Sequence, residues 1–391
     1  MAISTQRDIL TKMLLVACDQ SYQPGPGSNT PPLGGIVAKV GDPLQAYRDN
    51  AKKIDDHTNY QMPASWAEIQ LNDGTKFSDW RIDRRFDDRE SGFGAVVFGR
   101  DIGDGARDYI VALQGTRGAN IQDWSGNLIN GWDKWSNNSL KTAEEGGLIS
   151  YLLSLEQVNR IHFAGQSLGG ALAQYAAYDF IDNLLAVQTD IRSRTTLTTF
   201  NGLGGVEALM QHASDPNRTG FNPNLLFGVD TAHFVTDNDL VNRLGTANLN
   251  GAENEYLLRT LRTNDDGSPV TRLNGSFVKV SPIPEAHRIE TGFYYTFNAA
   301  ARNRANGMPL DFTQAVAQPI QHLQIAGFAN AGTAIAWASN KDGVNLTTAE
   351  SWARLMAAVL AGVAYRISRK SLTGDGSTGT NPTLSANTLN N

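Results

Sequence analysis

A single serine stands between two glycines where an apolar segment changes into an alanine-rich one. The stretch Gly165–Gly169 reads Gly-Gln-Ser-Leu-Gly, residues 160–164 before it have strand character, and residues 168–182 after it are typical of a helix. A serine at such a sharp strand-to-helix turn is the arrangement called a nucleophile elbow. A glycine-rich helix cap is the alternative interpretation, but the strand before the turn favours the elbow.

The elbow predicts a chemical role for Ser167. The turn would lift the serine hydroxyl clear of the sheet, and the N–H of Leu168, at the start of the next helix, would face a developing oxyanion. Serine is a poor nucleophile at neutral pH, so it needs a histidine to accept its proton and a carboxylate to orient that histidine. The chain is therefore expected to carry an acid and then a histidine after the serine.

The composition is that of a globular chain without a nucleic-acid partner. Its 391 residues are 41% hydrophobic and 18% charged, and they could form one large domain or two. The net charge of −6, with no run rich in lysine and arginine, argues against nucleic acid. The only cysteine, Cys18, lies in an apolar segment, so we expect it to be buried and to form no intrachain disulfide.

Targeting signals are absent from the sequence given. Arg7, Asp8 and Lys12 interrupt the apolar residues at the N-terminus, so the pattern of a secretory signal is not met. We expect either export by a route without a signal peptide or a cytoplasmic location. No apolar stretch reaches membrane-spanning length without a break, and we therefore expect no transmembrane segment.

Strand and helix signals alternate along the first 300 residues, and this alternation predicts an α/β sheet with helices on both faces. The expected elements are a helix at 3–22, hairpins at 67–82 and 94–113, a helix at 142–155, the elbow strand and helix at 160–182, strands at 195–200 and 232–236, and a hairpin at 256–280. Beyond about residue 300 the strand signals stop. We expect a domain at 1–300, a helical extension at 301–370 packed on it, and a disordered tail at 371–391 that is rich in Ser, Thr, Gly and Asn.

Two aspartates follow the expected strand at 232–236. Asp237 and Asp239 both qualify as the acid, because the carboxyl ends of parallel strands are where such a site lies. The alternative is that either is a turn or helix-capping residue. His233, within the strand, is expected to be a packing residue.

The histidine is best sought after the last strand signal. His287 follows the strand 277–280 and a proline-containing loop, so a last-strand loop would deliver it to Ser167. His322 lies in an alanine-rich helical region, and His212 comes before the acid strand, against the expected order. We therefore select His287 as the general base.

Three local matches make the chain similar to the fungal-type (class 3) lipases, a branch of the α/β-hydrolase fold. Residues 165–173 resemble the family's Gly-His-Ser-Leu-Gly-Gly-Ala-Leu-Ala. Residues 113–116, with 120–128 after them, resemble its Phe-Arg-Gly-Ser/Thr and lid segment, and residues 235–244 resemble the stretch around its triad acid. The resemblance covers about residues 60–300 and favours Asp239 over Asp237.

The resemblance implies an α/β-hydrolase fold, a Ser-His-Asp triad and an oxyanion donor at Thr116 beside Leu168. It departs from the family at Gln166 and Gln114, which replace a histidine and an arginine, and at Leu240 and Asn242, which replace prolines. These departures indicate a distant branch, of bacterial type, but remove no catalytic group.

A cluster of aromatic and aliphatic residues lies at 119–135, bracketed by glycines. It includes Trp124, Leu128, Trp132 and Trp135. The cluster could be core, but the resemblance favours a lid whose apolar face meets lipid.

We therefore expect an enzyme that cleaves carboxylic esters of lipids, most simply acylglycerols at a lipid–water interface, through an acyl-enzyme on Ser167. The expected chemistry requires no cofactor and no metal. Phospholipase A1 and a short-chain esterase are alternatives within the same chemistry, and a non-catalytic interaction protein is the alternative of another class. Acyl-chain length, headgroup and oligomeric state are not determined by the sequence.

Overall fold

The protein is described here from a computed structural model. The structure describes residues 5–23, 38–45, 69–88, 91–115, 131–211, 220–236, 239, 248–250, 254–258, 273, 289, 293 and 313–314.

A mixed sheet of eight strands forms the centre of the described structure, and its strands lie in sequence order from β1 to β8. Strands β3 to β7 are parallel to one another, whereas the pairs β1/β2, β2/β3 and β7/β8 are antiparallel. The strands are β1 (Arg81–Asp87), β2 (Gly94–Gly103), β3 (Ala106–Leu113), β4 (Val158–Gln166), β5 (Thr195–Phe200), β6 (Asp230–Thr236), β7 (Glu255–Leu258) and β8 (Thr313–Gln314).

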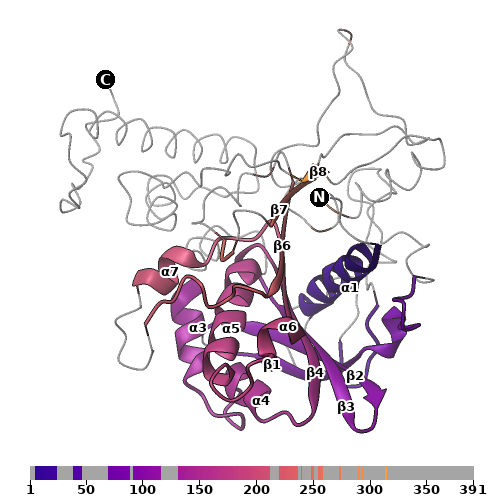
Figure 1. Ribbon diagram of the computed structural model, residues 1–391, viewed down its shortest axis with the longest axis horizontal. Coiled ribbons are helices and arrows are strands. Elements are labelled where there is room, and N and C mark those ends of the chain that lie inside the picture. Colours follow the sequence, from indigo (N-terminus) through magenta and orange to yellow (C-terminus); the bar gives the residue numbers. More distant parts are fainter. Residues whose placement is uncertain are drawn as a thin grey trace.

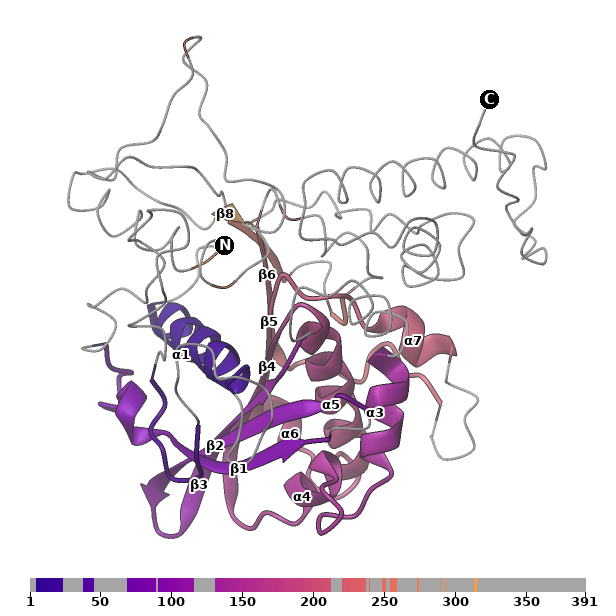
Figure 2. The same ribbon diagram turned by 180° about the vertical axis from the view of Figure 1, so that it is seen from behind.

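The helices are distributed unequally over the two faces of this sheet. They are α1 (Thr5–Ser21), the 3-10 helix η4 (Phe77–Asp79), α3 (Gly131–Ser139), α4 (Leu148–Leu153), α5 (Leu168–Leu184), α6 (Ile191–Arg194) and α7 (Val206–Gln211). Figures 1 and 2 show α3 to α6 on one side and α1 on the other. Because the parallel strands follow one another in a single direction, right-handed crossovers place the connecting helices on one face, and α1 covers the opposite one.

Both faces of the sheet are buried, and β3 shows this most simply. Tyr109, Val111 and Leu113 belong to the apolar layer under α5, whereas Ile110 and Ala112 belong to the layer under α1. Side chains alternate along a strand, so a strand buried on both faces reads as a continuous apolar run. The predicted α/β sheet with helices on both faces is confirmed.

Most of the expected central elements are present, several with longer bounds. The strands expected at 94–98 and 109–113 are β2 and β3, the elbow strand and helix are β4 and α5, and the strand at 195–200 is β5. The strand expected at 232–236 is β6, and the N-terminal helix is α1. Cys18 is fully buried in that helix, as expected, and burial raises the pKa of its thiol.

Two local predictions are wrong. Residues 69–80 do not form the expected hairpin: the turn forms, with the N–H of Leu71 donating to the carbonyl of Thr75, but η4 follows it and β1 begins only at Arg81. Phe77 and Trp80 are buried there, so packing in the core replaces the expected strand alternation. Helix α4 is also shorter than the 142–155 prediction, because residues 142–147 form turns.

The C-terminal part of the chain contributes a strand that was not expected. Thr313–Gln314 forms β8 and pairs antiparallel with β7, so the prediction that strand structure stops near residue 300 is wrong. The rest of the helical extension expected at 301–370 and the expected disordered tail lie outside the described residues, as does most of the hairpin expected at 256–280.

Candidate active site

Ser167 has the backbone conformation that the elbow requires. It connects β4 to α5 with φ 60° and ψ −129°, a region that residues other than glycine rarely occupy. Its N–H donates to the carbonyl of Phe200 at 3.1 Å, and its own carbonyl accepts from Gly170 and Leu203 at 2.9 and 3.0 Å. Three hydrogen bonds therefore hold a strained backbone in place, which is typical of functional sites.

Close backbone approach explains the glycines around this serine. A Cβ at Gly169 would overlap the carbonyl oxygen of Leu113 and lie 2.9 Å from the carbonyl carbon of Gln114. A Cβ at Gly170 would lie 2.5 Å from the Cα of Gly202. Helix α5 can begin directly against the ends of β3 and β5 only because these positions lack side chains.

The predicted oxyanion donors are described in part. Leu168 is the first residue of α5, and the first N–H groups of a helix have no partner within it. Thr116 lies outside the described residues. Its neighbour Gly115 is described, and a Cβ there would lie 3.2 Å from the Cβ of Ser167. The end of β3 therefore touches the predicted nucleophile.

Asp239 is completely buried three residues beyond the end of β6, and its N–H donates to the carbonyl of Thr236 at 3.1 Å. The strand end itself is held by Asn201, whose side chain accepts the N–H of Thr236 at 2.8 Å and donates to its hydroxyl at 3.1 Å. A carboxyl group enclosed at this edge fits the position predicted for the acid. The alternative acid, Asp237, lies outside the described residues.

The predicted base, His287, lies outside the described residues, as do His212 and His322. Both described histidines are engaged within the sheet. His233 contacts the hydroxyl of Thr199 at 2.8 Å and the carbonyl of Leu249 at 2.9 Å through its two ring nitrogens, as expected of a packing residue.

His162 lies on β4 beneath α1, with its Nδ1 2.8 Å from the hydroxyl of Thr196 and its ring edge-on to Trp80. Burial above all, together with the nearby charges of three arginines, lowers the pKa of His162 to about 3. This ring is neutral at physiological pH and has a structural position.

The aromatic cluster divides between described and undescribed residues. Trp132 and Trp135 lie in α3 and are buried, with the Trp132 ring edge-on to Tyr175 and the Trp135 Nε1 donating to Asp179 at 2.7 Å. These two tryptophans pack α3 on α5, so they belong to the core, which was the alternative to a lid. Trp124 and Leu128 lie outside the described residues.

Two polar residues near the site were not predicted from the sequence. The hydroxyl of Tyr22, directly after α1, accepts the N–H of Gly115 at 3.1 Å and donates to the Oε1 of Gln166 at 2.6 Å. Tyr22 is 144 residues from Gln166 in sequence, so no local pattern joins them. The departure from the lipase motif at Gln166 was the only available signal.

Gln174 is the second. It lies fully buried in α5, donates to the carbonyls of Gly170 and Leu203, and accepts the N–H groups of Gly205 and Leu249. This one amide therefore ties the loop after β5 to the chain segment that returns after the acid. A polar residue on the buried face of the elbow helix was a visible signal for such a role.

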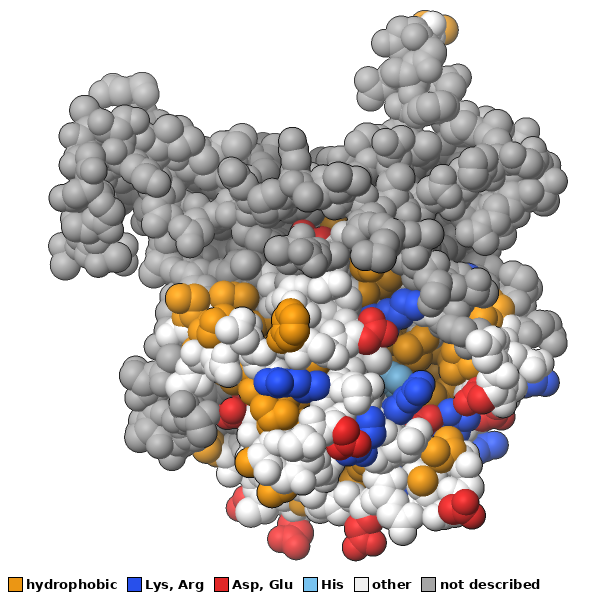
Figure 3. All heavy atoms as spheres, in the orientation of Figure 1, with side chains coloured by type: hydrophobic (Ala, Val, Ile, Leu, Met, Phe, Trp, Pro, Cys, Tyr) orange, Lys and Arg blue, Asp and Glu red, His pale blue; other side chains and the backbone are white. Residues whose placement is uncertain are grey.

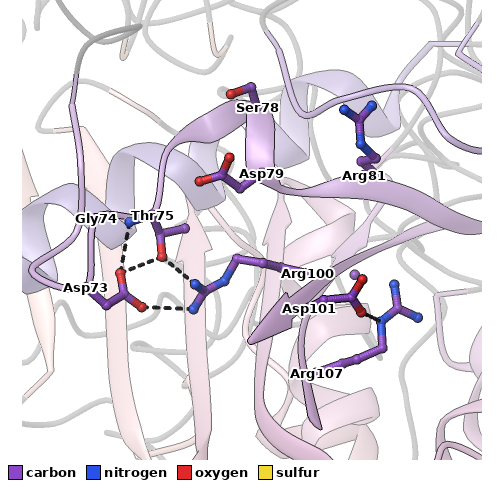
Figure 4. A pocket seen from close by; sticks show the side chains of 10 residues that line it. Asp73, Gly74, Thr75, Ser78, Asp79, Arg81, Arg100, Asp101 and Arg107 are labelled. Atoms are coloured by element: carbon purple, nitrogen blue, oxygen red, sulfur yellow. Dashed lines mark hydrogen bonds and ion pairs between the residues drawn. The ribbon is translucent and has the colours of Figure 1, made fainter. Parts of the chain in front are cut away.

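A polar pocket of about 450 Å³ lies at the other end of the strands (Figure 4). Two of its three arginines are paired with aspartates, since Arg100 contacts Asp73 at 3.0 Å and Asp108 at 2.5 Å and Arg107 contacts Asp101 at 2.8 Å. The third, Arg81, donates to the carbonyl of Gly41. On the face seen in Figure 3, basic and acidic side chains are likewise intermingled over the described residues. We therefore place the candidate site at Ser167 and not at this pocket.

None of the described helices is long and apolar enough to cross a membrane. Among the described residues, no group of three or more His, Cys, Asp or Glu side chains is arranged to hold a metal ion.

A family model described as a Tle-like phospholipase domain matches residues 44–183, about a third of the chain. The matched range contains the β2–β3 pair, the elbow and most of α5. No curated protein matches the chain.

Solved structures similar to the chain include fungal lipases. The Rhizomucor miehei lipase–propeptide complex is 14% identical over 66% of this chain and 70% of that one, with a TM-score of 0.37. A mutant of MDLA from Penicillium cyclopium is 14% identical over 82% and 98%, with a TM-score of 0.39. Lip2 lipase from Yarrowia lipolytica is 11% identical over 66% and 80%, with a TM-score of 0.36. These TM-scores are low, so the candidate site is inferred from the geometry around Ser167 and not from the fungal lipases.

Proposed function

We propose that this chain is a serine hydrolase that cleaves carboxylic esters of lipids through an acyl-enzyme on Ser167. The observation that carries the proposal is the backbone of this serine, held at φ 60° between a parallel strand and a helix N-terminus. A strained serine in this position presents its hydroxyl at the carboxyl edge of the sheet, where a substrate carbonyl can meet it.

The proposed reaction uses the triad in its ordinary roles. His287 takes the proton of the Ser167 hydroxyl as the oxygen attacks the ester carbonyl, and then gives that proton to the leaving alcohol. Water repeats the sequence on the acyl-enzyme and releases the fatty acid. Asp239 keeps the imidazole in the correct tautomer, and its burial supports that role because an enclosed carboxylate acts strongly on a nearby imidazolium.

The oxyanion of each tetrahedral intermediate is assigned to the N–H of Leu168 and a donor at Thr116. The start of α5 supports the first assignment, since its N–H points away from the helix that follows. The contact of Gly115 with Ser167 supports the second, because Thr116 is the next residue in the chain.

A lipid ester is the proposed substrate class, and the family model with its phospholipase-like description supports it. Ser167 is 4% exposed, so little of it faces solvent in this structure. The proposed lid at 119–135 is limited to the residues before α3, with Trp124 and Leu128 in its apolar part, because Trp132 and Trp135 pack α3 on α5. Opening of this lid at a lipid surface would admit the substrate.

A phospholipase that releases one fatty acid from a phospholipid is the second candidate. The phospholipase-like description of the same family model supports this candidate too, without favouring it over the first. The two candidates share the chemistry at Ser167 and differ in the walls that contact the headgroup.

The test measures fatty-acid release from triacylglycerol emulsions and from phosphatidylcholine vesicles, with Ser167→Ala and Ser193→Ala compared. Ser193 is exposed and only donates to the carbonyl of Asp190, so it is a matched control. We expect turnover and fluorophosphonate labelling in the wild type and the control, and their loss in Ser167→Ala. Release from vesicles alone would select the phospholipase. Equal turnover in Ser167→Ala would contradict the proposal.

A further inference from the structure

The hydroxyl of Tyr22 occupies the point where the hydrogen-bond ladder between β3 and β4 stops. The last ladder pair on these strands is Leu113 with Gly165. Just beyond it, the Tyr22 hydroxyl accepts the N–H of Gly115 and donates to the side chain of Gln166. A side chain from α1 therefore joins the two strand ends where their backbones no longer join each other.

The joined strand ends are those that lead into the proposed site. Gln166 immediately precedes the nucleophile, and Gly115 immediately precedes Thr116. A Cβ at Gly115 would lie 2.6 Å from the carbonyl oxygen of Gln166 and would overlap the Tyr22 hydroxyl. The position of Gly115 is thus determined by Tyr22 on one side and by residues 166–167 on the other.

The tyrosine is itself held from several sides. Residues 13–21 of α1 are buried against the sheet, and Tyr22 packs against the same apolar layer. Its N–H donates to the carbonyl of Asp19 at 3.2 Å. Arg85 on β1 donates to the carbonyl of the next residue, Gln23, at 2.6 Å. The hydroxyl therefore has little freedom to follow a displaced strand end.

We propose that Tyr22 is a positioning residue for the oxyanion site: by bridging Gly115 and Gln166, its hydroxyl sets the distance between Gly115, the residue before Thr116, and Ser167. The inference rests on the proposed function. Tyr22 acts through Gly115, and no contact with substrate is assigned to it. Because catalysis depends steeply on the alignment of oxyanion donors, loss of the bridge lowers the rate of the chemical step more than it lowers substrate binding.

The test compares Tyr22→Phe with Tyr178→Phe. The hydroxyl of Tyr178 also bridges two backbone groups, donating to the carbonyl of Gly220 and accepting the N–H of Asn222, but these belong to a loop that precedes β6. Both variants remove one oxygen and one bridge, so their effects on folding are matched. Turnover of a soluble short-chain ester is normalised to the sites titrated by a fluorophosphonate.

We expect Tyr22→Phe to lower kcat by about 10- to 100-fold with KM changed less than about twofold, and Tyr178→Phe to change neither appreciably. The matching thionoester, whose sulfur is a weak hydrogen-bond acceptor, should lose much less rate than the oxygen ester. Gln166→Met should lower kcat by a smaller factor, and the double variant should be no slower than Tyr22→Phe alone, because both changes break the same bridge.

Wild-type kcat per titrated site in Tyr22→Phe would overturn the inference, as would a change in KM alone or an equal loss on both ester types. Those results leave the proposed function standing. A wild-type protein that neither turns over esters nor reacts with the fluorophosphonate would instead overturn the proposed function and this inference with it.

Discussion

At the carboxyl ends of β3, β4 and β5, backbone atoms at the start of α5 lie directly against the chain at the ends of the strands, whereas at the amino end of β3 the contacts are made by arginine and aspartate side chains. The first end depends on Gly169, Gly170 and the hydrogen bonds of Ser167. The second depends on Arg100, Arg107 and their acidic partners (Figure 4). Backbone contacts tolerate no added atom, while long side chains adjust. Rigidity is therefore concentrated at the end where the reaction is proposed.

The strongest test of this difference compares one aspartate from each end. Asp239→Asn should lower kcat by roughly 10³- to 10⁴-fold with little change in stability, because an amide holds the histidine in the wrong tautomer. Asp108→Asn, which weakens the contacts of Arg100 and Asn159, should leave kcat unchanged and lower the free energy of unfolding by about 1–3 kcal/mol. Steady-state kinetics and urea titration measure both. Normal kcat in Asp239→Asn would transfer the acid role to another residue, with Asp237 as the first candidate.

A pair of glycines tests the rigidity itself. Gly169→Ala should lower the free energy of unfolding by about 3 kcal/mol or more, since the new methyl group meets backbone atoms that cannot rotate away. Gly103 has φ 97° at the β2–β3 turn, where a Cβ would meet nothing within 4 Å. Gly103→Ala should therefore cost only about 1–2 kcal/mol of backbone strain. Similar urea midpoints for the two variants would show that both ends of the strands tolerate an added methyl group equally well.

His162 lies halfway along β4, between the two ends, and adds a pH dependence. Its folded pKa of about 3 lies below the unfolded value near 6.5, so below pH 6.5 the unfolded chain binds a proton that the folded protein excludes. Stability contributed by the neutral ring is complete above pH 6.5 and falls as the pH drops toward 3. Between pH 7 and 5 the loss from this group should be about 2 kcal/mol.

His162→Asn removes this titration and can keep a hydrogen bond to Thr196. The variant should be less stable at pH 7 because of lost packing, but its free energy of unfolding should fall less than that of the wild type between pH 7 and 5. Parallel pH profiles of the two proteins would mean that His162 is protonated in the folded state.

The smallest effect is expected from the exposed ion pair at the amino end. Asp101, with a side chain 84% exposed, contacts Arg107 at 2.8 Å, and Arg107 also contacts Asp83. Asp101→Asn should change the free energy of unfolding by less than about 0.5 kcal/mol, and even less at high salt. A loss as large as the one expected from Gly169→Ala would show that this end is as rigid as the other.

The strands and the elbow could be predicted because their signals are local. Continuous apolar runs at 94–98 and 109–113 reflect burial on both faces of the sheet, and Gly165–Gly169 contains the whole turn in five residues. The prediction of a hairpin at 69–80 was wrong for a physical reason. The turn residues there are those of a hairpin, but burial of Phe77 and Trp80 favours a 3-10 helix, which the alternation of apolar and polar residues does not indicate.

The parts that escaped prediction are contacts between distant segments. Tyr22 lies 93 residues from Gly115 along the chain, and Asn201 lies 35 from Thr236. A single tyrosine or asparagine carries no signal of its partner in one sequence. The tryptophans of α3 were ambiguous for a related reason, because apolar residues between glycines suit a moving segment and a packed helix equally well.

The unbroken order of the strands also has a consequence for how the chain folds as the ribosome releases it. Each strand from β2 to β8 pairs with the strand that precedes it in the chain, so the sheet can grow in the direction of translation. Helix α1 is made first, yet it packs on β2, β3, β4 and β5, and Arg7 binds Thr198 across 191 residues. The apolar face of α1 therefore stays exposed until about half of the chain has been synthesised and these strands can cover it. Chaperone binding during synthesis is thus expected at the N-terminus, and docking of α1 with Tyr22 is expected to be a late step that completes the site.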